Sequence, residues 1–232
     1  MSTPFSQQLR DETAQVWNAA ITHRFVRELY EGTIADDVMA GYLLQDYRFL
    51  HSFLGLLGAG VATTDDEAAR IRLAQFIGEV AGDENTYFLR AFEALGVTEQ
   101  QRREVPLTTA ARGFLDLFDE AAATRSYAAV LAVLTVTEWL YLDWATTDPA
   151  PQRPENFVHA EWIDLHDYPG FHEIVAFLRG ELDRVGPADA EVARDFFRRA
   201  VDLELAFFEE SYISPLPLGA APAGADEDGA AQ

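Results

Sequence analysis

The amino-acid sequence predicts an all-α protein, a bundle of seven to eight helices, from three observations. Apolar residues recur at helical spacing along most of the 232 residues. Several of these stretches are apolar on more than one side, which is typical of helices at a bundle centre or a subunit interface. Strand-like alternation and hairpin turn dipeptides are not evident, and the hydrophobic content of 49% suffices for one sizeable core.

Local signals set the expected order of the helices. Asp36 and Asp37 open a long apolar helix, because acidic side chains favour a helix N-terminus. Thr98 and Gln101 form a capping box, and Pro106 ends the short helix that follows. In chain order, helices are expected at residues 6–21, 35–62, 65–95 with a bend at Gly82, 98–105, 108–122, 125–147, 156–185 and 187–213.

Two segments are expected to lack regular structure. Residues 146–156 contain three prolines and are predicted to form a loop. Residues 214–232 are rich in Pro, Ala and Gly and then acidic, which predicts a disordered tail. The chain is therefore expected to comprise one all-α domain, residues 1–213, followed by this tail.

Composition excludes several classes of function. The formal net charge of -22 opposes binding to nucleic acid and to anionic membrane surfaces. The sequence contains no cysteine, which excludes disulfides, thiolate metal sites and thiol nucleophiles. The N-terminal stretch has no apolar signal core, and no uninterrupted run of about 18 apolar residues occurs. We therefore expect no membrane-spanning helix and a cytoplasmic location.

Carboxylates within apolar helices are the best candidates for chemistry. Asp46 shares a helix face with Tyr42 and Phe49, since the three lie at i, i+4 and i+7. A carboxylate beside aromatic rings can grip an amino-bearing aromatic ligand. The alternative is a partly exposed Asp46 in an ion pair with Arg48 or Arg24.

Two further acids, Glu204 and Glu138, lie in apolar stretches and could also line a site. Glu204 lies at i, i+3 from Phe207, and burying an unpaired carboxylate is costly, so Glu204 needs a partner or a site. Glu138 lies beside Tyr141 in the apolar stretch 129–145. Glu138 either lines a site or faces outward at a seam between helices.

The apolar stretch and the following helix supply further candidates. Thr137, Tyr141 and Trp144 share one face at i, i+4 and i+7. Trp162 and His166 lie at i, i+4, so His166 could stack on a heteroaromatic ligand, shuttle protons or be a structural histidine. The three histidines after residue 158 do not share the spacing of a metal site. No metal or other cofactor is expected.

Several motifs, in this order, resemble the TenA, or thiaminase II, family. The motifs that match the family are "HRFVRELYEGTI", "YLLQDYRFL", "DENTYFLRAFEALGV", "TEWLYLDWA", "EWIDLHDYPGF" and "LELAFFEESY". The resemblance spans residues 5–213. It implies a haem-oxygenase-like helical fold without haem, assembled as a homo-oligomer (tetramer or dimer). It also implies hydrolysis of aminopyrimidines derived from thiamin.

The resemblance also implies roles for individual residues. Asp46 takes the place of the aspartate that hydrogen-bonds the pyrimidine amino group. Glu204 takes the place of the catalytic glutamate. Tyr141 takes the place of a site tyrosine, and Phe207 that of the phenylalanine packed on the ring.

Four positions depart from the family pattern. Thr137 stands where the thiol-bearing branch has its cysteine, and Phe49 where the motif often has tyrosine. His166 replaces another tyrosine, and Ala111 replaces an aromatic residue. The chain therefore resembles the cysteine-less branch, which implies amino- or formylamino-pyrimidine substrates attacked with the help of carboxylates.

Our hypothesis for the site combines these observations. A threonine hydroxyl needs an adjacent base, and neighbouring side chains on a helix diverge by about 100°, so Glu138 is poorly placed to activate Thr137. Instead, Asp46 orients the pyrimidine, Glu204 moves the proton, and Glu138 assists or activates water. The residues expected to bind the substrate are Tyr141, Phe207, Phe49, Thr137, His166, Trp144 and Tyr42.

Two alternatives remain at this point. The missing thiol and Ala111 fit a protein that binds a pyrimidine or regulates without catalysis. A metal-dependent oxidase of the same architecture is less well supported, because the closing motif "VDLELAFFEESY" contains no histidine.

Overall fold

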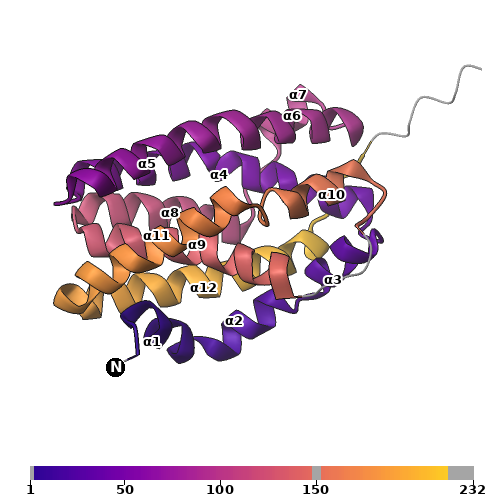
Figure 1. Cartoon of the computed structure of the whole chain (residues 1–232). Coiled ribbons are helices and arrows are strands. Elements are labelled where there is room, and N and C mark those ends of the chain that lie inside the picture. Colours follow the sequence, from indigo (N-terminus) through magenta and orange to yellow (C-terminus); the bar gives the residue numbers. More distant parts are fainter. Residues whose placement is uncertain (1–2, 148–152, 219–232) are drawn as a thin grey trace, which may run out of the picture.

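Two long helices, α4 (Asp36–Thr63) and α9 (Tyr127–Thr147), run through the middle of the bundle (Figure 1). The computed structural model describes residues 3–147 and 153–218. In the described residues the helix α9 packs against α12, α11 and α4, and α4 packs against α8 and α5. The other helices are α1 (Phe5–Glu12), α2 (Ala14–Ile21), α3 (Arg24–Glu31), α5 (Glu67–Glu79), α6 (Asn85–Ala94), α7 (Glu99–Glu104), α8 (Thr109–Thr124), α10 (Phe157–Asp164), α11 (Pro169–Val185) and α12 (Ala190–Ile213).

The predicted all-α class is confirmed, and the described residues contain more helical segments than the seven to eight expected because several predicted helices are interrupted. The predicted helix 65–95 contains a π-helical turn, η1 (Val80–Glu84), at the expected bend. A 3-10 turn, η2 (Gly186–Asp189), precedes α12. The capping box at Thr98 is present as predicted.

The expected helix 6–21 is wrong as one piece, because it breaks at Thr13. The Thr13 hydroxyl donates a hydrogen bond to the Leu9 carbonyl at 3.0 Å, and its backbone leaves the helical region with φ -102° and ψ 8°. Side chains that bond to nearby carbonyls compete with continued helix formation. Helix α3, which was not predicted, ends at Gly32, whose φ of 67° suits glycine.

The expected helix 156–185 is also wrong as one piece. Tyr168 is extended, with φ -134° and ψ 160°, and α11 begins at Pro169. Proline lacks an N–H and disfavours helical backbone in the residue before it, so the chain must leave one helix before entering the next. The predicted loop begins after α9, but its residues 148–152 lie outside the described residues.

The predicted tail is partly packed on the bundle. Leu216 is buried, and its backbone N–H donates to the Asp37 carbonyl at 2.9 Å. Gln101 donates from Nε2 to the Pro217 carbonyl at 2.9 Å. Disorder beginning at Ser214 is therefore incorrect for residues 214–218, and residues 219–232 lie outside the described part of the chain.

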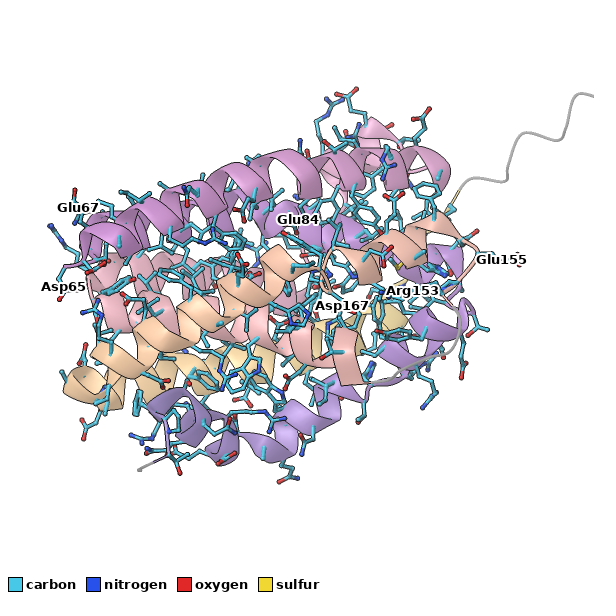
Figure 2. The ribbon with its side chains drawn as sticks, in the orientation of Figure 1. Asp65, Glu67, Glu84, Arg153, Glu155 and Asp167 are labelled. Atoms are coloured by element: carbon cyan, nitrogen blue, oxygen red, sulfur yellow. The ribbon has the colours of Figure 1, made fainter. Side chains whose placement is uncertain are left out.

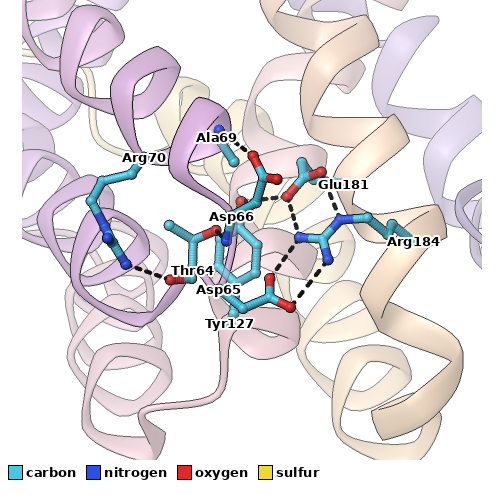
Figure 3. Close-up of polar contacts among 8 residues, drawn as sticks. All are labelled: Thr64, Asp65, Asp66, Ala69, Arg70, Tyr127, Glu181 and Arg184. Carbon is cyan, nitrogen blue, oxygen red and sulfur yellow. Dashed lines mark hydrogen bonds and ion pairs between the residues drawn. The ribbon is translucent and has the colours of Figure 1, made fainter.

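The turn between α4 and α5 is held by a polar network (Figure 3). Arg184 of α11 pairs with Asp65 at 2.8 Å and with Glu181 at 2.7 Å, and the Tyr127 hydroxyl donates to Glu181 at 3.1 Å. Exposed ion pairs contribute about 1 kcal/mol or less each. The network therefore fixes the position of this turn more than it stabilises the fold.

Helix α9 is the core helix of the bundle. By length and composition its residues 127–146 are apolar enough to cross a membrane, but 83% of the most apolar window is buried inside the protein. Its last acid, Asp143, accepts hydrogen bonds from Trp17 Nε1 at 2.9 Å and from Arg10 Nη2 at 3.3 Å. These two donors compensate the Asp143 carboxylate, which explains why an acidic residue is tolerated at the end of this apolar helix.

Candidate active site

A cavity lies between α4, the α5–η1 segment, α9, the end of α10, the start of α11, and α12. Its empty volume is about 760 Å³, including the open space at its mouth. The predicted residues that line it are Asp46, Phe49, Thr137, Glu138, Tyr141, His166 and Glu204. The other lining residues are Leu50, Phe53, Phe76, Glu79, Val80, Glu84, Trp162, Leu165, Tyr168 and Phe171.

Asp46 faces this cavity from the middle of α4. Its side chain is buried, and its Oδ2 has no hydrogen-bond partner in the described residues. The two arginines considered as partners are engaged elsewhere: Arg48 donates to the Val105 carbonyl at 2.7 Å, and Arg24 pairs with Glu28 at 3.3 Å. A buried oxygen without a partner costs free energy, so it marks a place where a ligand donor would be stabilised.

Glu204 enters the cavity from α12 and is almost fully buried, at 2% exposed. Burial raises the pKa of its carboxyl well above the usual range, and the nearby charges of Asp46 and Glu138 raise it further. A carboxyl group in this condition holds its proton to higher pH than an exposed glutamate. Such a group is suited to proton transfer near neutral pH.

Glu138 lines the cavity from α9, so the structure places it at the site and not at an outward seam. Burial raises the pKa of Glu138 well above its usual range, and the charge of Glu84 adds to this effect. The hydroxyl of Thr137 lies 3.5 Å from Glu138 Oε1 but only 3.1 Å from the Leu134 carbonyl. Because the hydroxyl has a closer backbone acceptor, Glu138 is not positioned to deprotonate it.

Asp46 shares this electrostatic environment. Burial raises the pKa of Asp46 well above its usual range, and the charges of Glu84 and Glu138 raise it further. Three carboxyl groups from three helices therefore oppose one another's ionisation inside one cavity. A bound cation or amino group would relieve this repulsion.

His166 completes the wall without adding a positive charge. Burial lowers the pKa of His166 to about 4, so the imidazole is neutral at neutral pH. Its Nδ1 lies 2.7 Å from the Trp162 carbonyl, which only accepts, so Nδ1 carries the proton and Nε2 is an acceptor. The predicted proton-shuttle role is not supported by this low pKa, whereas ring packing with Tyr141, at 4.8 Å between centroids, is present.

Three predicted binding residues lie behind the wall instead of lining the cavity. The Tyr42 hydroxyl is 2.7 Å from the Tyr141 hydroxyl. Phe207 packs edge-on against Phe49 at 5.4 Å between ring centroids. Trp144 packs against Tyr141 at 5.6 Å. Each of these residues supports a ring that faces the cavity.

Glu79 and Glu84 are acidic lining residues that the sequence patterns did not place at this site. No group of three or more potential ligands that could hold a metal is found among the described residues. Burial raises the pKa of Glu84 to about 7. Its proximity to Asp46 and Glu138 depends on the π-helical turn, which has no clear sequence signal.

Glu84→Gln is expected to weaken the pH dependence of stability between about pH 4.5 and 7. The unfolded chain releases this proton near its usual pKa of 4.5, whereas the folded protein holds it up to a pKa of about 7. The free energy of unfolding therefore falls as pH rises through this window, by at most about 1.4 kcal/mol per pH unit. Urea unfolding at pH 5, 6 and 7 measures the slope, with exposed Glu93→Gln as the control. Equal slopes in all three proteins would contradict the prediction.

The helical bundle has a haem-oxygenase-like fold. A domain of unknown function with a heme oxygenase-like fold from Shewanella denitrificans OS217 superposes with a TM-score of 0.69 and 14% identity, covering 89% of this chain and 91% of that chain. The TenA homologue protein from P. horikoshii OT3 has a TM-score of 0.83 and 20% identity, covering 91% and 100%.

The chain belongs to the TENA/THI-4/PQQC family, whose model matches residues 10–214. A relative named aminopyrimidine aminohydrolase, from Helicobacter pylori, is 23% identical over 214 residues, which cover 90% of this chain and 99% of the relative. The family resemblance predicted from the motifs is therefore confirmed. The absence of cysteine agrees with the predicted cysteine-less branch.

Proposed function

We propose that this protein hydrolyses a C–N bond of an amino- or formylamino-pyrimidine derived from thiamin, using carboxylates in place of a thiol. The observation that supports it most strongly is the cavity lined by Asp46, Glu138 and Glu204, which come from three helices and are all buried. The name of the Helicobacter relative supports the same reaction class.

In the proposed reaction, Asp46 accepts a hydrogen bond from the amino group of the pyrimidine. Its buried Oδ2 has no partner in the described residues, so this acceptor is free for a ligand. The walls formed by Phe49 and Tyr141 pack on the ring. The hydroxyl pair of Tyr42 and Tyr141 holds the tyrosine ring in place.

Proton transfer falls to Glu204 and Glu138. Water oxygen forms a bond to the substrate carbon while the carbon–nitrogen bond breaks. The proton leaving the water passes to an ionised carboxylate. A protonated amine leaves as ammonia, whereas the neutral nitrogen of a formylamino group takes a proton from a carboxylic acid as it departs. Because the charge of Glu138 opposes the ionisation of Glu204, one of the two carboxyl groups can hold a proton while the other is ionised.

A panel of amino- and formylamino-pyrimidines tests this proposal. We expect the purified protein to release ammonia or formate in a one-to-one ratio with the pyrimidine product. A non-catalytic pyrimidine binder is the second candidate, since Thr137 stands at the position of the family's cysteine and donates to a backbone carbonyl. Calorimetric binding without any release of ammonia or formate would favour that candidate and overturn the hydrolase proposal.

The proposal also includes a homo-oligomer, a tetramer or dimer, in the cytoplasm. The resemblance to the family implies this assembly. Light scattering on the purified protein would test it, and a monomer at micromolar concentration would contradict it.

A further inference from the structure

The π-helical turn η1 places an additional acid at the cavity. A π turn closes i→i+5 hydrogen bonds, so residues five apart lie on one side of it, and such turns occur often at functional sites. Glu79 and Glu84 are five residues apart, and both line the cavity. Figure 2 shows Glu84 on the α5–η1–α6 segment, opposite the α10–α11 connection that carries Asp167.

The two acids differ in their partners. Glu79 accepts a hydrogen bond from Arg72 at 3.2 Å, so its charge is neutralised by an ion pair. Glu84 makes no ion pair with the residues that the structure describes, and its side chain is only partly buried. Asp46, Glu138 and Glu204 lie deeper, with less than a tenth of each side chain exposed. Glu84 is therefore the uncompensated acid closest to solvent at this cavity.

The lining as a whole is acidic. Among the lining residues that the structure describes, five are carboxylic acids and none is an arginine. The five acids are Asp46, Glu79, Glu84, Glu138 and Glu204. The imidazole of His166, whose pKa is lowered by burial, does not offset them at neutral pH. Above about pH 7, where Glu84 is ionised, a substrate that carries a positive charge is stabilised at such a cavity. A neutral substrate of the same shape gains nothing from this charge.

We propose that Glu84 determines substrate specificity by charge, so that the site prefers pyrimidines with a protonated amino substituent over their neutral formylamino counterparts. This inference rests on the proposed function, because it concerns the same cavity. The carboxylate of Glu84 attracts the ammonium group at the mouth of the cavity. It takes no part in breaking the carbon–nitrogen bond.

The test compares two substrates in three proteins at pH 8, where Glu84 is ionised because the pH exceeds its pKa of about 7. Each substrate has the same pyrimidine ring, with either an aminomethyl or a formylaminomethyl group, and the proteins are the wild type, Glu84→Gln and Glu93→Gln. We expect Glu84→Gln to lower kcat/KM for the amine about tenfold through KM, because one partly screened charge pair is lost. For the neutral substrate we expect a change of less than about twofold.

Glu93→Gln is the matched control, because it removes the same charge from an exposed position on α6. It should leave both substrates unchanged, and Glu84→Asp should retain part of the preference for the amine. An equal loss for both substrates, or no loss for the amine, would overturn the role of Glu84.

Calorimetry with the same two compounds separates the two proposals. Turnover of both substrates with an unchanged preference in Glu84→Gln overturns the role of Glu84 alone. Binding that prefers the amine and loses this preference in Glu84→Gln, without any turnover, overturns the hydrolase proposal and supports the role of Glu84.

Discussion

Glu204→Gln is expected to lower kcat on an aminopyrimidine substrate by about 10²- to 10⁴-fold, the range typical of general acid–base catalysis. The glutamine amide has nearly the same size, but it neither takes a proton from water nor gives one to the leaving nitrogen. Because Glu204 lies buried beside Asp46 and Glu138, neither bulk water nor an exposed carboxylate can easily replace it. Steady-state kinetics with product detection measures the effect.

The control is Glu209→Gln, an exposed glutamate on the same helix, which should leave kcat unchanged. The folded protein must also be intact in Glu204→Gln. Since burial and neighbouring charges raise the pKa of Glu204, stability falls as pH rises above the usual glutamate range. The variant should therefore be at least as stable as the wild type at pH 8. Undiminished turnover would remove Glu204 from the chemistry.

Trp17→Ala is expected to reduce the free energy of unfolding by about 3–5 kcal/mol, the usual cost of removing a buried large aromatic side chain. Trp17 is fully buried and stacks on Phe197 at 5.9 Å between ring centroids. It also packs against Trp139 at 5.1 Å, and its Nε1 donates to Asp143 at 2.9 Å. The substitution thus leaves a cavity between α2, α9 and α12 and removes a hydrogen bond from Asp143.

Trp17→Phe separates these two effects. It keeps most of the apolar packing but loses the N–H donor, so a loss of about 1–3 kcal/mol is expected. Urea unfolding gives both values from the midpoint and slope of the transition. If Trp17→Ala lowers the free energy of unfolding by less than about 1 kcal/mol, the packing of α2 on the core contributes little to stability. That result would contradict the prediction.

The long apolar helices could be predicted from the sequence because their signals are local. The acidic residues at 36–37 mark the start of α4, and the capping box at Thr98 marks that of α7. Interruptions were harder to predict, although Pro169 is itself a sequence signal for the break before α11. The break at Thr13 depends on a side-chain hydrogen bond that competes with a continuing helix, and threonine alone does not determine it.

The candidate site could be predicted only in part. Helical spacing identified Asp46, Glu138 and Glu204 as unusual acids, but it could not show that three helices bring them to one cavity. Residues at i, i+3 and i+4 share a broad face of a helix, and the cavity borders only part of that face. Phe207 shares such a face with Glu204 yet packs behind the wall. The position of Glu84 at the cavity could not be predicted, because the π turn changes which side of the helix the following side chains face.

The most direct test of the central claim is a single turnover of an aminopyrimidine in water labelled with ¹⁸O. If buried carboxylates activate water, the pyrimidine product acquires one ¹⁸O atom, one ammonia is released, and the protein remains unlabelled by mass spectrometry. If a carboxylate instead attacks the substrate carbon, hydrolysis of the resulting ester puts ¹⁸O into Glu138, Glu204 or Asp46 and leaves the product unlabelled. That labelling pattern, or the absence of product, would contradict the account.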